Sequence, residues 1–268
     1  MKTITPIARE RSHTLHFLNE IGQLAPVFLD TEIDMTRILE HRATARQNDR
    51  RYSFVTYVLY AAGRVLAEHP EANAAIRGRR WPQIARYRAV NGKLTLDKTL
   101  HGHRVVLATV VADLDRAVMD DIQAKVDHFR DGDPDEMPEF ARVRALHKLP
   151  WPFGGAAFRA AIRPLKRRGT VLGTFAVTSL GHRPVDGFHS MGGTTITLGV
   201  GQVLDRPVVR KAQLAIAPVM RLNMAFDHRV IDGAEAADVL ASIRARLERF
   251  DTELAHDVPQ VAAETGQR

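Results

Sequence analysis

The sequence predicts an α/β fold in which a mixed β-sheet is covered by helices. Short apolar strand patterns alternate with longer segments of helical periodicity, and such interleaving is typical of helices packed on a sheet. With 268 residues and 45% hydrophobic content, the chain can bury a large core. No linker rich in Pro, Gly or Ser divides it, so we expect a single domain over residues 1–250. Residues 251–268 lose the apolar period, which indicates a flexible C-terminal tail.

Three helices and six strands account for this pattern. Apolar residues recur at intervals of three and four from Phe54 to Leu66, from Leu114 to Phe129, and from Ala236 to Phe250. The first of these helices should end before Pro70. Strands are expected at residues 27–34, 93–99, 104–111, 173–179, 194–200 and 217–227.

Composition excludes several functional classes. Cysteine is absent, which rules out disulfides, thiolate metal sites and a cysteine acyl-enzyme. No segment approaches the ~20 apolar residues that span a bilayer, so we expect a soluble, cytoplasmic protein. His101-Gly102-His103 has no third metal ligand at a recognisable spacing, and we expect no metal site. The motifs of serine hydrolases, phosphate loops and dinucleotide-binding folds do not occur.

The stretch FDHRVIDG, Phe226 to Gly233, places a histidine at the end of an apolar strand and just before a helix. If the chain stays extended, His228 shares the apolar face of Met224 and Phe226. Burial there would keep the imidazole neutral and able to accept a proton. A structural histidine is the alternative, and Asp232 and Glu235 have the spacing of a helix capping box.

The longer string DHRVIDGA resembles the active-site signature of the dihydrolipoamide acyltransferases, the E2 family related to chloramphenicol acetyltransferase. GTFAVTSLG, Gly173 to Gly181, is similar to the strand and turn that this family has about fifty residues before the histidine. Residues 53–73 resemble a family helix that ends in Pro-x-x-Asn. The resemblance covers roughly residues 6–250. It implies a two-layer α+β sandwich like that of chloramphenicol acetyltransferase, a homotrimer with active sites between subunits, and coenzyme A or acetyl-CoA as cosubstrate.

The resemblance also implies roles for individual residues. His228 would be the general base, and Thr178, with Ser179 beside it, would donate a hydrogen bond to the oxyanion. Asp232 would hold the histidine loop by pairing with an N-terminal arginine, for which Arg11 is a better match than Arg9. Phe188 matches a position that lines the pantetheine channel, although a core phenylalanine is an equal alternative.

The sequence departs from the family pattern at positions that the resemblance places around the substrate channel. Met191-Gly192-Gly193 is about two residues shorter than the corresponding loop of complex-forming members, and residues 99–104 are bulkier. We find no lipoyl domain in the sequence, and we expect no covalently bound lipoyl group. We therefore expect an O-acetyltransferase acting on a small-molecule hydroxyl in specialised metabolism, such as a tetronate polyketide intermediate. An E2 core that uses a lipoyl domain of another chain is the alternative. A catalytically silent trimeric scaffold or carrier-binding protein is a third hypothesis.

Residues 138–168 form an extra segment before the GTF strand. From Ala141 to Arg168 there are eight basic residues and no acidic one. A solvated basic face, a membrane-surface helix and a nucleic-acid patch are open interpretations, although no nucleic-acid-binding motif accompanies the charges. Attraction of coenzyme A phosphates or of an acyl carrier protein is a fourth.

Overall fold

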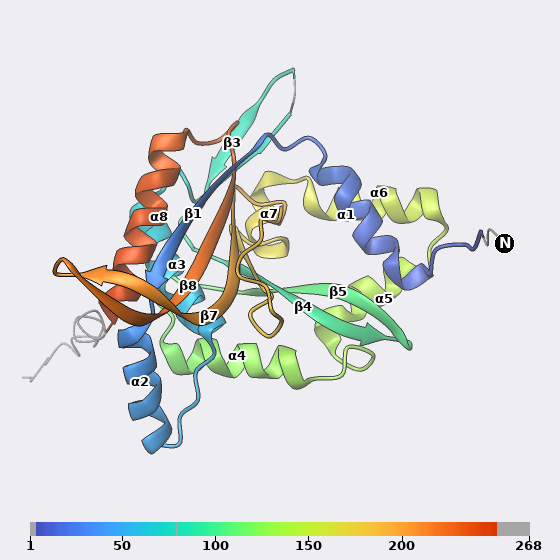
Figure 1. Ribbon diagram of the computed structural model, residues 1–268. Coiled ribbons are helices and arrows are strands. Elements are labelled where there is room, and N and C mark those ends of the chain that lie inside the picture. Colours follow the sequence, from blue (N-terminus) through green and yellow to red (C-terminus); the bar gives the residue numbers. More distant parts are fainter. Residues whose placement is uncertain (1–3, 79, 251–268) are drawn as a thin grey trace, which may run out of the picture.

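The computed structural model describes residues 4–78 and 80–250, with a six-stranded mixed sheet at the centre (Figure 1). Its strands are β1 (Pro26–Asp34), β4 (Gly92–Leu100), β5 (His103–Val111), β6 (Phe175–Ser179), β7 (Ile196–Arg210) and β8 (Gln213–Asp227). The order is β1-β8-β7-β6-β4-β5, with β6 parallel to both β7 and β4 and the other pairs antiparallel. The predicted mixed sheet is confirmed. The predicted tail, residues 251–268, lies outside the described residues.

Four of the six strands agree with the sequence prediction to within two residues, and the other two are longer. The β7 and β8 strands continue beyond the sheet as a two-stranded ribbon that ends at the turn between Arg210 and Gln213. Ribbon residues such as Val209 and Leu214 are 75% and 79% exposed, so the ribbon lacks the apolar alternation of a buried face. A separate hairpin, β2 (Ala74–Arg77) with β3 (Gln83–Arg86), has no strong strand pattern and was not predicted.

Helices α3 (Phe54–Glu68) and α8 (Gly233–Glu248) cover one face of the sheet. The Ser53 hydroxyl caps α3 by accepting from the Thr56 N–H, and α3 ends before Pro70 as predicted. Helix α2 (Thr36–Gln47) packs on α8, and α4 (Met119–Asp131) packs on α3. The predicted start of α4 at Leu114 is wrong. Leu114 lies in a turn, where it is fully buried and so contributes to the apolar pattern without being helical.

The hydrophobic core lies between these helices and the sheet. Its largest fully buried side chains include Tyr57, Tyr60, Phe175, Phe226 and Phe250. Burial of each such side chain stabilises the fold by about 1.5–3 kcal/mol. Phe175 and Phe226 come from β6 and β8, so the core anchors the strand that carries Thr178 and the strand that leads into His228.

The opposite face of β7 and β8 is covered by the loop of residues 181–193. The Phe188 N–H donates to the Asn223 side-chain oxygen over 3.0 Å. A Cβ on Gly199 would lie 2.2 Å from the Phe188 carbonyl oxygen, so only glycine allows this approach. Asn223 and Asp227 are therefore buried, at 4% and 3% exposure. Both faces of β8 are thus covered in this region.

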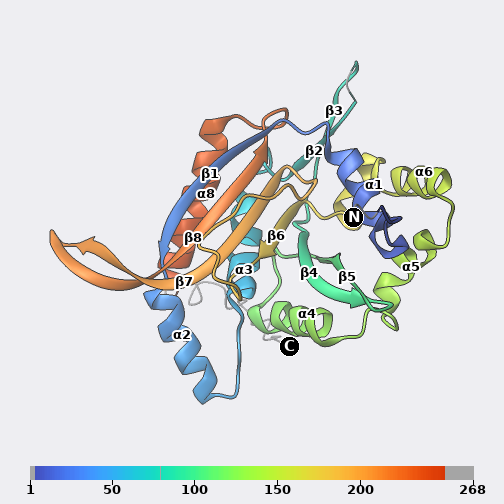
Figure 2. The ribbon, with the colours of Figure 1, turned by 45° about the vertical axis from the view of Figure 1, so that its right-hand side comes forward.

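The extra segment is helical and packs beside the sheet with the N-terminal helix (Figure 2). It contains η2 (Pro138–Phe140), α5 (Ala141–His147), α6 (Trp151–Ile162) and α7 (Leu165–Val171). The short η1 (Arg9–Arg11) and α1 (Ser12–Ile21) contact α5, and α1 also contacts α6. His16 of α1 lies 4.4 Å from the Trp151 ring, centroid to centroid, and fits against Gly154 and Gly155. No helix in the described part of the chain is long and apolar enough to cross a membrane.

A histidine pair joins this segment to the sheet. His13 Nε2 is 2.9 Å from the Val106 carbonyl oxygen. Because a carbonyl oxygen only accepts, this nitrogen must carry the hydrogen. His13 Nδ1 is 2.9 Å from His147 Nε2. Nδ1 of His13 then accepts from His147. The remaining His147 nitrogen is buried and has no partner among the described residues.

We expect this pair to make stability depend on pH. Burial, with a further contribution from His13, lowers the pKa of His147 to about 4. The unfolded chain, with a histidine pKa of about 6.5, takes up the proton first as pH falls. Unfolding free energy should therefore be highest above about pH 6.5 and decline toward pH 4. Urea titrations at pH 7.5 and 5 should show a weaker decline in His147→Gln than in the parent or in the exposed control His128→Gln. An unchanged decline in His147→Gln would contradict this expectation.

Candidate active site

The candidate active site is built around the turn that follows β8. Asp227, the last strand residue, is buried and accepts from the Ala25 N–H over 3.3 Å and from the Arg229 guanidinium, whose Nε is 2.9 Å from Oδ1. Its backbone carbonyl accepts from the Val230 N–H. The His228 N–H donates to the Ala25 carbonyl over 2.9 Å. These bonds fix the backbone on which the His228 ring is presented.

The His228 side chain is 46% exposed and does not lie on the buried face of the strand. The expected apolar burial is wrong for a single protomer, because the strand ends at Asp227 and the chain turns at His228. His228 Nδ1 lies 3.4 Å from Asp232 Oδ1. A carboxylate at Nδ1 favours the tautomer that carries its hydrogen there and leaves Nε2 able to accept a proton. The ring also lies 5.7 Å from the Phe226 ring, centroid to centroid.

The predicted capping box does not form. Asp232 occupies the N-cap position of α8, but within the described residues its side chain makes no capping hydrogen bond and is 89% exposed. Glu235 lies 2.9 Å from His69 Nδ1 instead. Asp232 instead lies beside His228, with its Oδ1 3.4 Å from His228 Nδ1, whereas the family resemblance implies a pair with an N-terminal arginine. Arg11 is exposed and lies in η1, which packs on β5 and α5, so the predicted pair with Asp232 is not made inside this protomer.

Thr178 and Ser179 lie together at the end of β6. The Thr178 side chain is half-buried, and its hydroxyl makes no hydrogen bond to any residue that the structure describes. The Ser179 hydroxyl accepts from the Gly181 N–H over 3.3 Å and so belongs to the turn that leaves the strand. Phe188 is half-buried on the loop over β7 and β8.

The sheet register keeps Thr178 and His228 of one protomer apart. Thr178 pairs with Gly199, which pairs with Asn223, four residues before Asp227. Strand rise and spacing put Thr178 roughly 16 Å from the Asp227 end of the strand. Groups that act on the same reacting atom must lie within about 3 Å of it. The two predicted catalytic side chains can therefore meet only if they come from different protomers.

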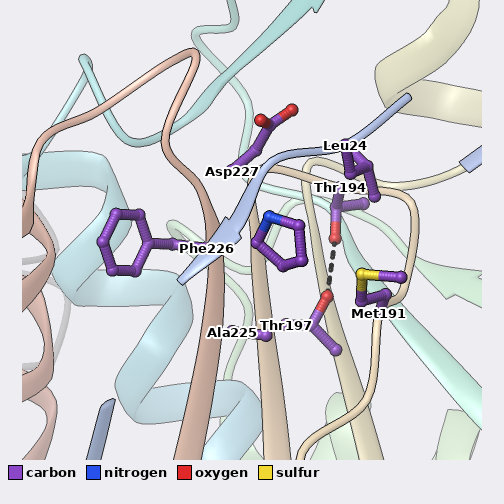
Figure 3. Close-up of a pocket in the computed structure, with 8 residues that line it drawn as sticks. Leu24, Met191, Thr194, Thr197, Ala225, Phe226 and Asp227 are labelled. Atoms are coloured by element: carbon purple, nitrogen blue, oxygen red, sulfur yellow. Dashed lines mark hydrogen bonds between the residues drawn. The ribbon is translucent and has the colours of Figure 1, made fainter. Parts of the chain in front are cut away.

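A small cavity lies beside Asp227 and is bordered by the loop that the sequence marked as shortened (Figure 3). Met191, Thr194 and Thr197 lie on one side of it. Its volume of about 10 Å³ is close to that of a single water site, so it cannot hold a thioester substrate. A much larger groove, about 600 Å³, lies at the base of the β7–β8 ribbon between β1, α2 and α8, away from His228.

A buried lysine and a half-buried arginine hold the shortened loop. Lys93 donates to the Gly192 carbonyl, and its Nζ lies 4.5 Å from the centre of the Phe17 ring of α1. Burial, and secondarily Arg168, lowers the Lys93 pKa to about 7. Arg168 donates to the Gly193 carbonyl over 2.9 Å. Sequence reasoning did not single out Lys93, Arg168, Asp227 or Arg229 as site residues. Only Asp227 and Arg229 carried a signal, as neighbours of His228 in the motif.

The two histidines of His101-Gly102-His103 contact different acidic residues. His101 Nδ1 lies 3.2 Å from Asp135, and His103 Nε2 lies 3.7 Å from Glu10. The two rings at the β4–β5 turn thus lie beside different carboxylates.

Comparison with known protein families matches residues 2–131 and 157–255 to the family described as 2-oxoacid dehydrogenases acyltransferase (catalytic domain). The chain therefore belongs to this family, as the sequence motifs predicted. The match omits residues 132–156, which include η2 and α5 of the extra segment.

Curated relatives are similar along most of the chain. The acetyltransferase component of the Bacillus subtilis pyruvate dehydrogenase complex is 24% identical over 222 residues, which cover 81% of this chain and 43% of the relative. The succinyltransferase component of the Pseudomonas aeruginosa 2-oxoglutarate dehydrogenase complex is 26% identical over 258 residues, which cover 91% and 53%. The chain thus spans about half the length of these relatives.

The fold is that of an acyltransferase core. The crystal structure of Azotobacter vinelandii dihydrolipoamide acetyltransferase superposes with a TM-score of 0.71 at 19% identity and covers 95% of this chain and 94% of the other. The predicted two-layer architecture is therefore confirmed.

Proposed function

We propose that this protein transfers an acyl group between the thioester of coenzyme A and a dihydrolipoyl-type thiol, with His228 as the general base. The observation that carries the proposal is the His228 ring, presented on a fixed turn with a carboxylate 3.4 Å from Nδ1. Family membership supports the reaction class, and the relatives are named as dihydrolipoyllysine-residue acetyl- and succinyltransferases. Both acetyl and succinyl groups thus occur among the acyl groups that these relatives are named for.

Each catalytic group has one task in the proposed reaction. His228 Nε2 removes the proton from the acceptor thiol as its sulfur attacks the thioester carbonyl carbon. The carbonyl oxygen becomes an oxyanion, which accepts a hydrogen bond from the Thr178 hydroxyl of an adjoining protomer. The tetrahedral intermediate collapses, the bond to the coenzyme A sulfur breaks, and the leaving thiolate takes the proton from His228. Asp232 stabilises the imidazolium in between.

Residue spacing in a relative agrees with this assignment. In the Azotobacter vinelandii enzyme, a serine, a histidine and an asparagine have been investigated for roles in the catalytic mechanism. The asparagine there follows the histidine by four residues, as Asp232 follows His228, and the serine precedes it by about fifty, as Thr178 does. The present chain differs in having a carboxylate in place of the amide and a threonine in place of the serine.

The proposed site requires an assembly, for which we propose the homotrimer. The register separates Thr178 from His228 in one protomer, and a cyclic trimer would repeat one interface and one site three times. An Arg11–Asp232 pair and a role for Phe188 in lining the substrate channel are part of the same proposal and would form across that interface. The predicted catalytic domain, residues 1–250, would be the repeating unit, and we expect it to act in the cytoplasm.

A hydroxyl acceptor is the second hypothesis, but the relatives favour a thiol. No relative reported above is named for a tetronate or another polyketide substrate. A thiol, with a pKa near 8.5, also gives up its proton to an imidazole far more readily than an alcohol does.

Product analysis separates the hypotheses. The protein is incubated with acetyl-CoA and either dihydrolipoamide or a hydroxymethyl tetronate, and products are identified by mass spectrometry. We expect S-acetyldihydrolipoamide and no acetylated tetronate. Acetylation of the tetronate alone would replace the proposal by the O-acetyltransferase hypothesis. Binding of acetyl-CoA without transfer to either acceptor would favour the catalytically silent scaffold.

A further inference from the structure

The β2–β3 hairpin and helix α7 form one basic surface, although they are far apart in sequence. The Tyr87 hydroxyl, just after β3, donates to the Leu165 carbonyl at the start of α7 over 2.8 Å, and α7 contacts both hairpin strands. Apart from Arg86, which pairs with Glu71, the exposed basic residues described on this surface are Arg77, Arg80, Arg88, Lys166 and Arg167, hereafter the basic face. Figure 1 shows the hairpin projecting beyond the sheet with α7 near its base.

The basic face lacks counter-charges. No Asp or Glu occurs from Ala72 to Leu96 or from Ala141 to Arg168. Glu71, just before the first of these segments, is already engaged by Arg86, whose Nε lies 2.8 Å from its Oε2. None of the five basic side chains makes an ion pair with another described residue, whereas arginines elsewhere, such as Arg206 with Asp186, are paired. An unpaired cationic surface of this kind attracts an anionic partner.

Apolar side chains on the same hairpin indicate a protein partner. Trp81 is 85% exposed at the hairpin end, and Ile84 of β3 is 41% exposed. Exposed tryptophan beside arginine is the composition of protein-interface hot spots. Trp81 and Ile84 would gain by burial against another protein, which a purely phosphate-binding surface does not require.

The basic face is connected to the catalytic turn by short paths. The Thr195 hydroxyl donates to the Ala74 carbonyl at the start of β2, and the Thr195 carbonyl accepts from the Asp227 N–H over 2.9 Å. From the other side, Arg168 of α7 donates to the Gly193 carbonyl of the loop beside the cavity. A partner on the basic face would thus sit next to the backbone that presents His228.

We propose that the basic face docks an acidic carrier domain that brings the acyl acceptor thiol on a flexible arm to His228. This inference rests on the proposed function, because that function requires a thiol that the relatives' names place on a protein lysine residue. It goes further by assigning the docking surface to the hairpin and α7. The carrier is recognised through its carboxylates by Arg77, Arg80, Arg88, Lys166 and Arg167, and through an apolar patch by Trp81.

A charge-reversal pair with a matched control tests the surface. Arg80→Glu/Lys166→Glu changes two residues of the basic face, and Arg46→Glu/Lys125→Glu changes two exposed basic residues on α2 and α4 by the same net charge. The probe is a purified dihydrolipoyl domain with net negative charge, compared with free dihydrolipoamide. We expect the first variant to raise KM for the domain about 10-fold or more and to leave KM for the free thiol unchanged. The control variant should change neither.

The salt dependence of domain binding and the effect of a Trp81 substitution test the docking surface independently. Binding of the domain, followed by fluorescence anisotropy, should weaken with ionic strength in the parent and lose most of that dependence in Arg80→Glu/Lys166→Glu. Trp81→Ala should weaken binding while keeping the salt dependence. Equal effects of both double variants, or unchanged binding of the domain in Arg80→Glu/Lys166→Glu, would overturn the proposal. So would a variant that loses binding only of a short DNA duplex or of anionic lipid vesicles.

These experiments distinguish a failure of the proposed catalytic function from a failure of the docking proposal. If the parent binds the domain in a salt-sensitive way through the basic face but transfers acetyl groups to neither thiol, the docking surface stands and the catalytic proposal is wrong. If transfer to free dihydrolipoamide proceeds while the domain does not bind, the docking proposal is wrong and the catalytic one stands.

Discussion

His228→Ala should lower kcat for transfer from acetyl-CoA to dihydrolipoamide by about 10²- to 10⁴-fold, the range typical of a lost general base. The side chain is 46% exposed and contributes little packing, so the melting temperature should stay close to that of the parent. The loss should fall on kcat more than on KM, because the imidazole acts on a proton that moves in the transition state.

The control for this variant is His128→Ala, an exposed histidine on α4 that pairs with Glu139. It should keep the parental rate. A His228→Ala protein that is folded, binds acetyl-CoA and turns over at the rate of the control would remove His228 from the mechanism.

Thr178→Val should reduce kcat by about 10²- to 10³-fold, because valine keeps the shape of the side chain but cannot donate to the oxyanion. This corresponds to roughly 2.7–4 kcal/mol of transition-state stabilisation. Thr178→Ser retains the donor and should recover much of the rate. The free hydroxyl makes the test clean, since no hydrogen bond to a described residue is broken by the change.

Thr31→Val provides a matched threonine on β1, also half-buried. It should leave kcat unchanged. If Thr178→Val retains full activity, or if Thr178→Ser is as slow as Thr178→Val, the oxyanion donor lies elsewhere. Steady-state rates of the four proteins at saturating acetyl-CoA give this comparison directly.

The sequence predicted best those elements whose apolar pattern comes from the element alone. Helix α3 has an apolar stripe and a proline after its end, and both agree with the structure. Helix α4 was predicted to begin at Leu114, because a buried turn residue continues the apolar spacing without being helical. The ends of β7 and β8 were missed because an exposed ribbon is held by backbone hydrogen bonds, which do not depend on side-chain alternation.

At the site, the sequence identified residues but not their surroundings. The motif drew attention to His228 and Asp232, and the structure places them 3.4 Å apart. The predicted end of the strand at Asp227 is confirmed, but the sequence could not reveal that the turn leaves the ring half-exposed. Lys93 could not be found either. Its burial follows from the packing of Phe17 and the Gly192 loop around it, and both are distant in sequence.

We propose that each active site combines His228 of one protomer with Thr178 of the next. Mixing His228→Ala and Thr178→Val proteins in equal amounts, after dissociation and reassembly, tests it directly. In a cyclic assembly with random mixing, half of the sites have an intact His228, and half of those face an intact Thr178, so about one quarter of the wild-type rate should return. Two nearly inactive proteins that together regain this rate would support a shared site. A mixture that stays as inactive as its components, despite confirmed exchange of protomers, would contradict it.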